Sequence, residues 1–62
     1  MEAIEGTAMV AKFVWACRAG NVPMARQLID EGVDINGLHD GYTGLQRAIG
    51  CRKMEIVNLL LA

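Results

Sequence analysis

The apolar residues of this chain recur in four groups at helical spacing, separated by glycines and short polar stretches. In the first half, apolar side chains every three or four residues favour two helices, which are predicted to end at Gly20 and Gly32. Thr7 is predicted to cap the first helix, after a lead-in over residues 1–6, and Asn21 to cap the second. Their predicted buried stripes are Met9, Val10, Phe13, Ala16 and Cys17, followed by Val22, Met24, Ala25, Leu28 and Ile29.

The second half restarts the same pattern after an extended arm. Apolar and polar residues alternate over 33–36, and Gly37 and Gly41 bracket a tight reversal. Thr43 is predicted to cap a third helix, and a fourth begins near Met54. The apolar positions of these two helices are Leu45, Ala48, Ile49, Met54, Ile56, Val57, Leu60 and Leu61.

The two halves match when the chain is laid on itself with a shift of 32 residues. A repeat near this length indicates a stacked-repeat architecture, in which each unit buries its apolar face against a copy of itself. The matched apolar pairs are Phe13 with Leu45, Ala16 with Ala48, Cys17 with Ile49, Val22 with Met54, Met24 with Ile56, Ala25 with Val57, Leu28 with Leu60 and Ile29 with Leu61.

The composition adds that this apolar surface is large for the size of the chain. Of 62 residues, 53% are hydrophobic, although a chain this short buries only about 60% of the surface that its unfolded form exposes. We therefore expect some apolar surface either to meet a partner or to lack its continuation.

Charge and residue spacing argue against several classes of protein. Six basic and seven acidic residues are scattered along the chain and give a net charge of −1, so a nucleic-acid-binding face is not expected. A DNA-binding helix-turn-helix would need a basic second helix, but that helix ends in Asp30 and Glu31.

No apolar run is long enough to span a membrane, and Glu2 and Glu5 stand where a signal peptide would be positive. The single His and two Cys lack metal-ligand spacing. We expect an intracellular, cytoplasmic protein with no metal, no cofactor and no disulfide.

Several motifs resemble the ankyrin repeat. Gly41-Tyr42-Thr43-Gly44-Leu45-Gln46 is similar to its Gly-x-Thr-Pro-Leu-His helix start, Ile56-Val57-Asn58-Leu59-Leu60-Leu61 to its Ile-Val-x-Leu-Leu-Leu run, and Gly32-Val33-Asp34-Ile35-Asn36 to its Gly-Ala-Asp-Val-Asn ending. The resemblance implies an all-α fold: helix-turn-helix repeats joined by an extended β-hairpin arm, forming a short solenoid fragment. It divides the chain into a first repeat of N-capping type over residues 7–37 and a second, incomplete repeat over 38–62.

Three positions depart from the ankyrin pattern. Gly44 replaces its Pro and Gln46 its His, and we expect these changes to loosen the start of the third helix. Arg52 replaces the Gly between the two helices of the repeat, which requires a left-handed backbone costing about 1 kcal/mol or more for a residue with a side chain.

The resemblance also implies a non-catalytic protein–protein interaction module whose partner is another protein. A catalytic site would need a polar constellation in a cleft, for which two helix pairs offer no room. Family members usually bind through hairpin tips and the exposed faces of the leading helices. The matching positions here are Leu38, His39, Asp40 and Tyr42 at the tip, with Arg18, Ala19, Gly50 and Cys51 on the leading helices.

Some of these residues have a structural alternative. Tyr42 and Leu38 suit an interaction hot spot, but Tyr42 could equally pack over its own hairpin. His39 and Asp40, as neighbours in a turn, are expected to point apart, as a solvated turn rather than a catalytic pair.

Other side chains are assigned structural roles. Trp15 and Arg47 occupy matching positions, so we predict a cation–π stack joining the units; without that stack, Trp15 would be available to a partner. Cys17 is predicted to be a small buried hydrophobe and Cys51 to be exposed. Asn36 is predicted to bond the backbone of the bend through its side chain.

The run Leu59, Leu60 and Leu61 leaves two hypotheses open. In the ankyrin family the next unit covers much of this run. Either the chain is a piece of a longer array, or this end docks on another chain, including a copy of itself, to form a homo-oligomer.

Overall fold

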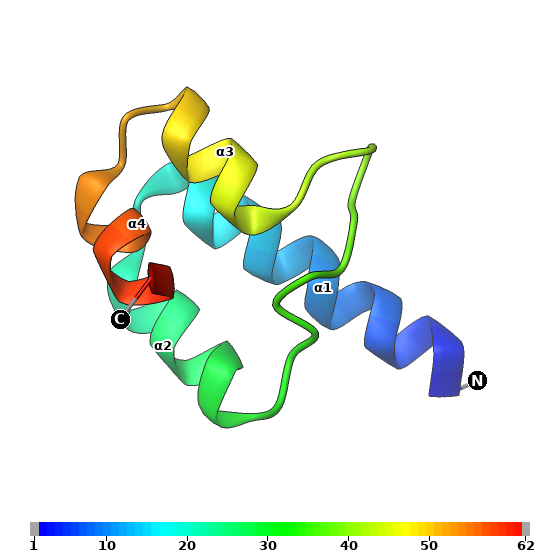
Figure 1. The fold of residues 1–62 in the computed structure, drawn as a ribbon. Coiled ribbons are helices and arrows are strands. Elements are labelled where there is room, and N and C mark those ends of the chain that lie inside the picture. The colour runs from blue at the N-terminus through cyan, green and yellow to red at the C-terminus, as the bar shows by residue number, and fades with distance from the viewer. Residues whose placement is uncertain (1, 62) are drawn as a thin grey trace.

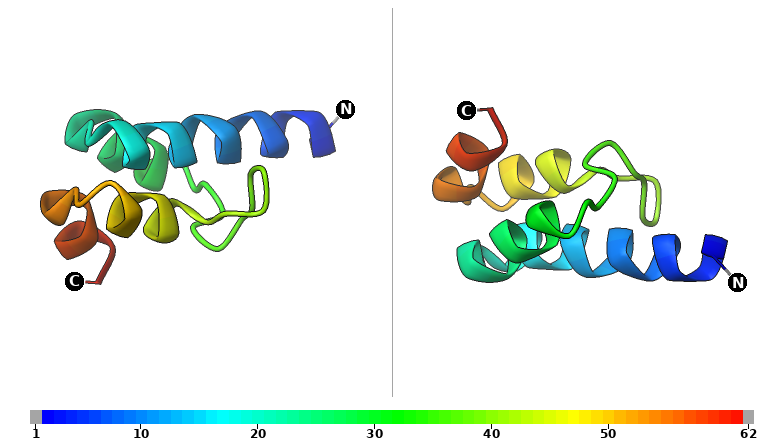
Figure 2. Two further views of the ribbon diagram at one scale, coloured as in Figure 1. Left: turned by 90° about the horizontal axis from the view of Figure 1, so that it is seen from above. Right: turned by 90° about the horizontal axis from the view of Figure 1, so that it is seen from below.

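Four α-helices arranged as two antiparallel pairs make up the fold. The computed structural model describes the backbone of residues 2–61 and the side chains of residues 8–61. In chain order the helices are α1 (Glu2–Ala19), α2 (Val22–Asp30), α3 (Gly44–Gly50) and α4 (Met54–Leu61) (Figure 1). The pair α1–α2 lies on the pair α3–α4 as two layers, with α3 beside α1 and α4 beside α2 (Figure 2). The predicted all-α repeat fold is confirmed, and the described backbone contains no strand.

The start of α1 differs from the sequence prediction. The helix begins at Glu2, so Thr7 lies within it and not at its N-cap. Glu and Ala are good helix formers. These preferences outweigh the single Gly6, which costs about 1 kcal/mol in a helix interior.

The turn between α1 and α2 follows the local signals of the sequence. Gly20 has a φ of +76°, which ends α1 in the left-handed region, as predicted. The Oδ1 atom of Asn21 accepts a hydrogen bond from the N–H of Met24 at 3.2 Å and so caps α2. Pro23 occupies the first turn of α2, where a missing N–H is tolerated.

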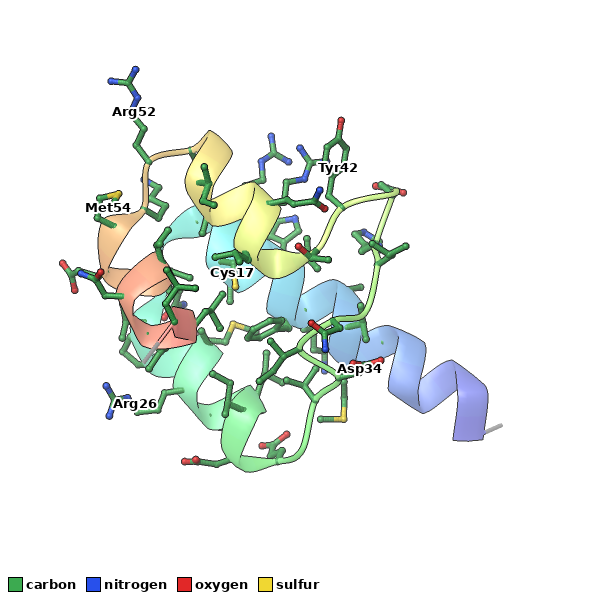
Figure 3. The ribbon with its side chains drawn as sticks, viewed as in Figure 1. Cys17, Arg26, Asp34, Tyr42, Arg52 and Met54 are labelled. Carbon is green, nitrogen blue, oxygen red and sulfur yellow. The ribbon has the colours of Figure 1, made fainter. Side chains whose placement is uncertain are left out.

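The third helix begins with a capping box, contrary to the loosening that we predicted. The Thr43 hydroxyl accepts a hydrogen bond from the Gln46 N–H at 3.1 Å, and the Gln46 side-chain oxygen accepts one from the Thr43 N–H at 2.8 Å. Both terminal N–H groups are thereby satisfied, so Gln46 tightens this start. At the other end of α3, Arg52 has the predicted left-handed backbone, with a φ of +57° (Figure 3).

The core lies between the two layers and contains one aromatic ring, that of Phe13. Phe13, Cys17 and Ile56 are its largest fully buried side chains, and the prediction of a buried Cys17 is confirmed (Figure 3). Gly44 brings α3 close to α1, because a Cβ at this position would lie 2.8 Å from both Phe13 Cε2 and Cys17 Sγ. The other buried members of the core are Ala16, Ala25, Leu28, Val33, Ala48 and Val57.

Matched positions in the two units differ in burial. Cys17 is fully buried, but its counterpart Ile49 is 57% exposed. The first unit's stripe is covered by the second unit except at Met24, whose predicted burial is wrong because it is 36% exposed, whereas the described chain places no further helix pair over the second. Met54 and Leu61 are 59% and 69% exposed for the same reason.

The arm between α2 and α3 contains a bend and a two-residue hairpin. At the bend, the Asp34 carboxylate accepts a hydrogen bond from the Asn36 N–H at 3.1 Å. We predicted that the side chain of Asn36 would bond the backbone of this bend. In the structure the Asp34 carboxylate makes such a bond, because it reaches the N–H two residues ahead.

Candidate functional site

The hairpin tip presents one aliphatic and one aromatic side chain to solvent. His39 and Tyr42 exchange two backbone hydrogen bonds, of 2.9 and 3.1 Å. The two residues between them, Asp40 and Gly41, both have positive φ, as a tight hairpin turn of this hand requires. This turn leaves Leu38 64% and Tyr42 46% exposed.

Tyr42 is held in place by Arg47 of α3. The Arg47 guanidinium carbon lies 4.1 Å from the centroid of the Tyr42 ring, within the range of a cation–π contact. Arg47 therefore stacks on the hairpin, and the predicted stack of Trp15 with Arg47 is wrong. The sequence register places the two positions one above the other, but α3 starts directly after the hairpin and brings Arg47 back toward Tyr42.

Trp15 does not stack on Arg47, which is the case in which the sequence analysis expected it to be available to a partner. It is 65% exposed on α1 and borders two hollows. The first, of about 290 Å³, is shared with Arg18 and Ala19. The second, of about 270 Å³, is lined by Ala11, Lys12, Trp15, Met24 and His39. One signal in the sequence was a bulky aromatic residue outside the apolar stripe of its helix.

The structure brings together most of the predicted binding residues. Arg18 and Ala19 lie at the Trp15 hollow, and His39 links that region to the hairpin tip. Gly50 and Cys51 are also exposed, but they lie at the far end of α3 from Tyr42. We call the set Trp15, Arg18, Ala19, Leu38, His39, Asp40 and Tyr42 the tip–helix surface.

His39 and Asp40 lie closer together than predicted. The His39 Nε2 and Asp40 Oδ2 atoms are 3.6 Å apart, so the two side chains do not point away from each other. Both are exposed to solvent, where such a pair contributes little energy.

The two thiols differ in environment. Burial raises the pKa of the Cys17 thiol from 9.0 to about 11, so this group is protonated at neutral pH. Cys51 is exposed, as predicted, and both cysteines are free.

The described part of the chain shows neither a metal site nor a membrane-spanning helix. Among those residues, no group of three or more His, Cys, Asp or Glu side chains is placed to hold a metal ion. None of the described helices is long and apolar enough to cross a membrane.

A second apolar region lies at the C-terminal end of the solenoid. Leu59 and Leu60 are half-buried and Leu61 is exposed, and Ile49 and Met54 add to the exposed apolar residues of this unit. These five residues are called the open end below.

Comparison with known proteins agrees with this helix-pair architecture. The family model for ankyrin repeats, which describes three copies, matches residues 10–62. The chain belongs to the ankyrin repeat family. It is also 35% identical over 54 residues to the 2-5A-dependent ribonuclease of Mus musculus. That match covers 84% of this chain but only 7% of the ribonuclease. No solved structure matches the chain.

Family membership fixes the general class of function. Ankyrin repeats are generally non-catalytic modules that bind other proteins. The ribonuclease activity named for the mouse relative belongs to a protein of which this ankyrin chain spans a small fraction.

Proposed function

We propose that this ankyrin chain binds another protein through the tip–helix surface, with Trp15 as its central anchor. The exposure of Trp15 carries the proposal. Trp15 is the largest side chain of α1, and it lies in solvent beside two hollows and not in the core. Tryptophan, tyrosine and arginine are the residues most enriched at interaction hot spots. Gly50 and Cys51 would extend the contact along α3.

The rigidity of the tip supports the same proposal. Tyr42 is fixed by the two backbone hydrogen bonds of the hairpin and by the guanidinium of Arg47. A side chain that is already ordered loses less conformational entropy on binding than a mobile one. Tyr42 would therefore be preorganised for contact with a partner.

Quantitative affinity capture tests the proposal. The wild-type chain is compared with the double variant Trp15→Ala, Leu38→Ala. The control is Ile35→Ala, which removes an exposed apolar side chain that does not belong to the tip–helix surface. Proteins captured by the wild type and the control should be depleted about tenfold or more with the double variant. Equal capture by all three chains would refute the proposal, provided that circular dichroism shows the variants to be folded.

Self-association through the open end is a second candidate function. The exposure of Ile49, Met54 and Leu61, whose counterparts Cys17, Val22 and Ile29 are covered to a greater extent, favours it. An isologous dimer through this face would bury both copies of the open end.

Light scattering over a range of concentrations tests this alternative. A mass of twice the chain that falls on dilution, and that Leu61→Asp reduces to that of a monomer, would support it. Leu38→Asp serves as the matched control, because it places the same charge on an equally exposed leucine outside the open end. A monomeric mass at all concentrations would exclude the dimer.

A further inference from the structure

Positive charge is concentrated around Trp15. Lys12 and Arg18 each line one of the two hollows that Trp15 borders, and both are exposed. Arg47 adds a third cation at the adjoining hairpin, over the Tyr42 ring. Within the tip–helix surface itself, Arg18 is the single Lys or Arg and Asp40 the single acidic residue, so the excess of positive charge comes from Lys12 and Arg47 at its border.

The other four acidic side chains of residues 8–61 lie outside this surface. Asp30 and Glu31 close α2, Asp34 begins the arm that follows, and Glu55 lies in the first turn of α4. In Figure 3, Arg26 lies on α2 and Asp34 on the arm, and both are apart from Tyr42. Lys12 and Arg18 therefore give the two sides of Trp15 a local positive charge that the net charge of −1 does not show.

We propose that the tip–helix surface binds an acidic peptide segment that carries an apolar side chain between two carboxylates. This inference rests on the proposed function and names the chemistry of the partner. The cations select for carboxylates, and the Trp15 ring with its neighbouring hollow receives the apolar side chain.

The positions on α1 set the spacing of the two carboxylates. Lys12 and Arg18 each lie three residues from Trp15, on either side of it along the helix. Six residues of helix place their backbones about 9 Å apart along the axis and about 120° apart around it, so the two side chains leave α1 on opposite sides of Trp15. An extended peptide covers about 10 Å in three residues, so the expected pattern is two acids at least three positions apart with an apolar residue between them.

A peptide fits this surface better than a nucleic acid does. Asp40 lies within the surface, and the charge of the whole chain is negative, so a polyanion of many phosphates would be repelled beyond the first contacts. A short peptide needs only the two cations beside Trp15. Single-stranded nucleic acid, which could also stack on Trp15, is made an arm of the test.

The experiment uses a library of random short peptides displayed on phage, selected against the full chain. Enriched peptides are synthesised without tryptophan and titrated while the fluorescence of Trp15, the single tryptophan of the chain, is recorded. We expect enriched sequences to carry two acids at least three positions apart with an apolar residue between them. Their affinity should fall when salt is raised from about 50 to about 300 mM, because exposed charges are screened.

Matched neutral variants locate the charge effect. Arg18→Gln should weaken binding of the acidic peptides by about tenfold, whereas Arg26→Gln, an exposed arginine on α2, should leave it unchanged within about twofold. Both arginines are exposed, so circular dichroism should show the same helix content in both variants. Equal weakening by both variants would overturn the proposal.

The remaining outcomes separate this inference from the proposed function. Enrichment of neutral or basic peptides that still change Trp15 fluorescence would refute the acidic partner but leave protein binding intact. Peptides that bind without affecting Trp15 would refute both. Tighter binding of a single-stranded oligonucleotide than of any selected peptide would also refute the inference.

Discussion

The guanidinium of Arg47 covers the ring of Tyr42, with 4.1 Å between the guanidinium carbon and the ring centroid. This contact joins α3 to the hairpin that precedes it. It fixes an aromatic side chain at the tip without burying it, since Tyr42 remains 46% exposed. The tip is thus ordered from within its own repeat.

A double-mutant cycle should detect this contact. We expect Tyr42→Leu and Arg47→Met, made singly and together, to reveal a coupling free energy of about 0.5–1 kcal/mol in urea unfolding, as for exposed cation–π pairs. The same cycle with Trp15→Leu in place of Tyr42→Leu serves as the control and should give no coupling to Arg47. Coupling of Arg47 to Trp15 alone would contradict the geometry.

Gly44 should not tolerate a side chain. Although alanine is the better helix former, a Cβ at Gly44 would lie 2.8 Å from both Phe13 Cε2 and Cys17 Sγ. We expect Gly44→Ala to reduce the free energy of unfolding by about 1–3 kcal/mol, as overpacking of a core does. Chemical denaturation of the purified variant measures this directly.

Gly50 provides the matched control for Gly44. It lies in the same helix, and a Cβ at this position would meet nothing within 4 Å. Gly50→Ala should therefore stabilise the chain by up to about 1 kcal/mol. Destabilisation by both alanine substitutions would show that packing against Phe13 is not the cause.

Arg52 should be improved by replacement with glycine. Its φ of +57° lies in the left-handed region, where a side chain costs about 1 kcal/mol or more. We expect Arg52→Gly to raise the midpoint of thermal unfolding and Arg26→Gly, in the middle of α2, to lower it. A fall with both variants would mean that the Arg52 side chain makes a contact worth more than the strain.

The sequence predicted the parts of the fold that depend on local hydrogen bonds and backbone preferences. Gly20 and Gly32 end helices with positive φ, Asn21 and Thr43 cap helices, and Arg52 takes a left-handed conformation, all as expected. Each of these features is decided within a few residues of chain. The capping role of Gln46 was missed because the family pattern, and not the local chemistry of a Thr followed three residues later by Gln, was used at that position.

Features that depend on neighbouring elements were harder to predict. The 32-residue repeat gives Arg47 and Trp15 matching positions in the two units. The direction of the long Arg47 side chain, however, is decided by where the hairpin enters α3. The burial of Ile49 depends on what covers the second unit and not on Ile49 itself. The exposure of Trp15 depends in the same way on neighbouring elements, because it is decided by how α2 and α3 pack around α1.

Cys17 is an acidic group held neutral by the core. Its side chain is fully buried, and desolvation raises the pKa of its thiol from 9.0 to about 11. The folded state therefore binds this proton more tightly than the unfolded state does. The linked stability is fully present below about pH 9 and is lost as the pH rises toward 11.

Alkaline unfolding should reveal this linkage. Between pH 9 and 11 the wild-type chain should lose up to about 3 kcal/mol of unfolding free energy through this thiol, since one pKa unit corresponds to about 1.4 kcal/mol. Cys17→Ala removes the thiol, so its unfolding free energy should fall less steeply over the same range. Urea unfolding of both chains at matched pH measures this difference. Cys51→Ala, which removes an exposed thiol, should keep the wild-type slope. Parallel pH profiles for the wild type and Cys17→Ala would show that the buried thiol does not control alkaline stability.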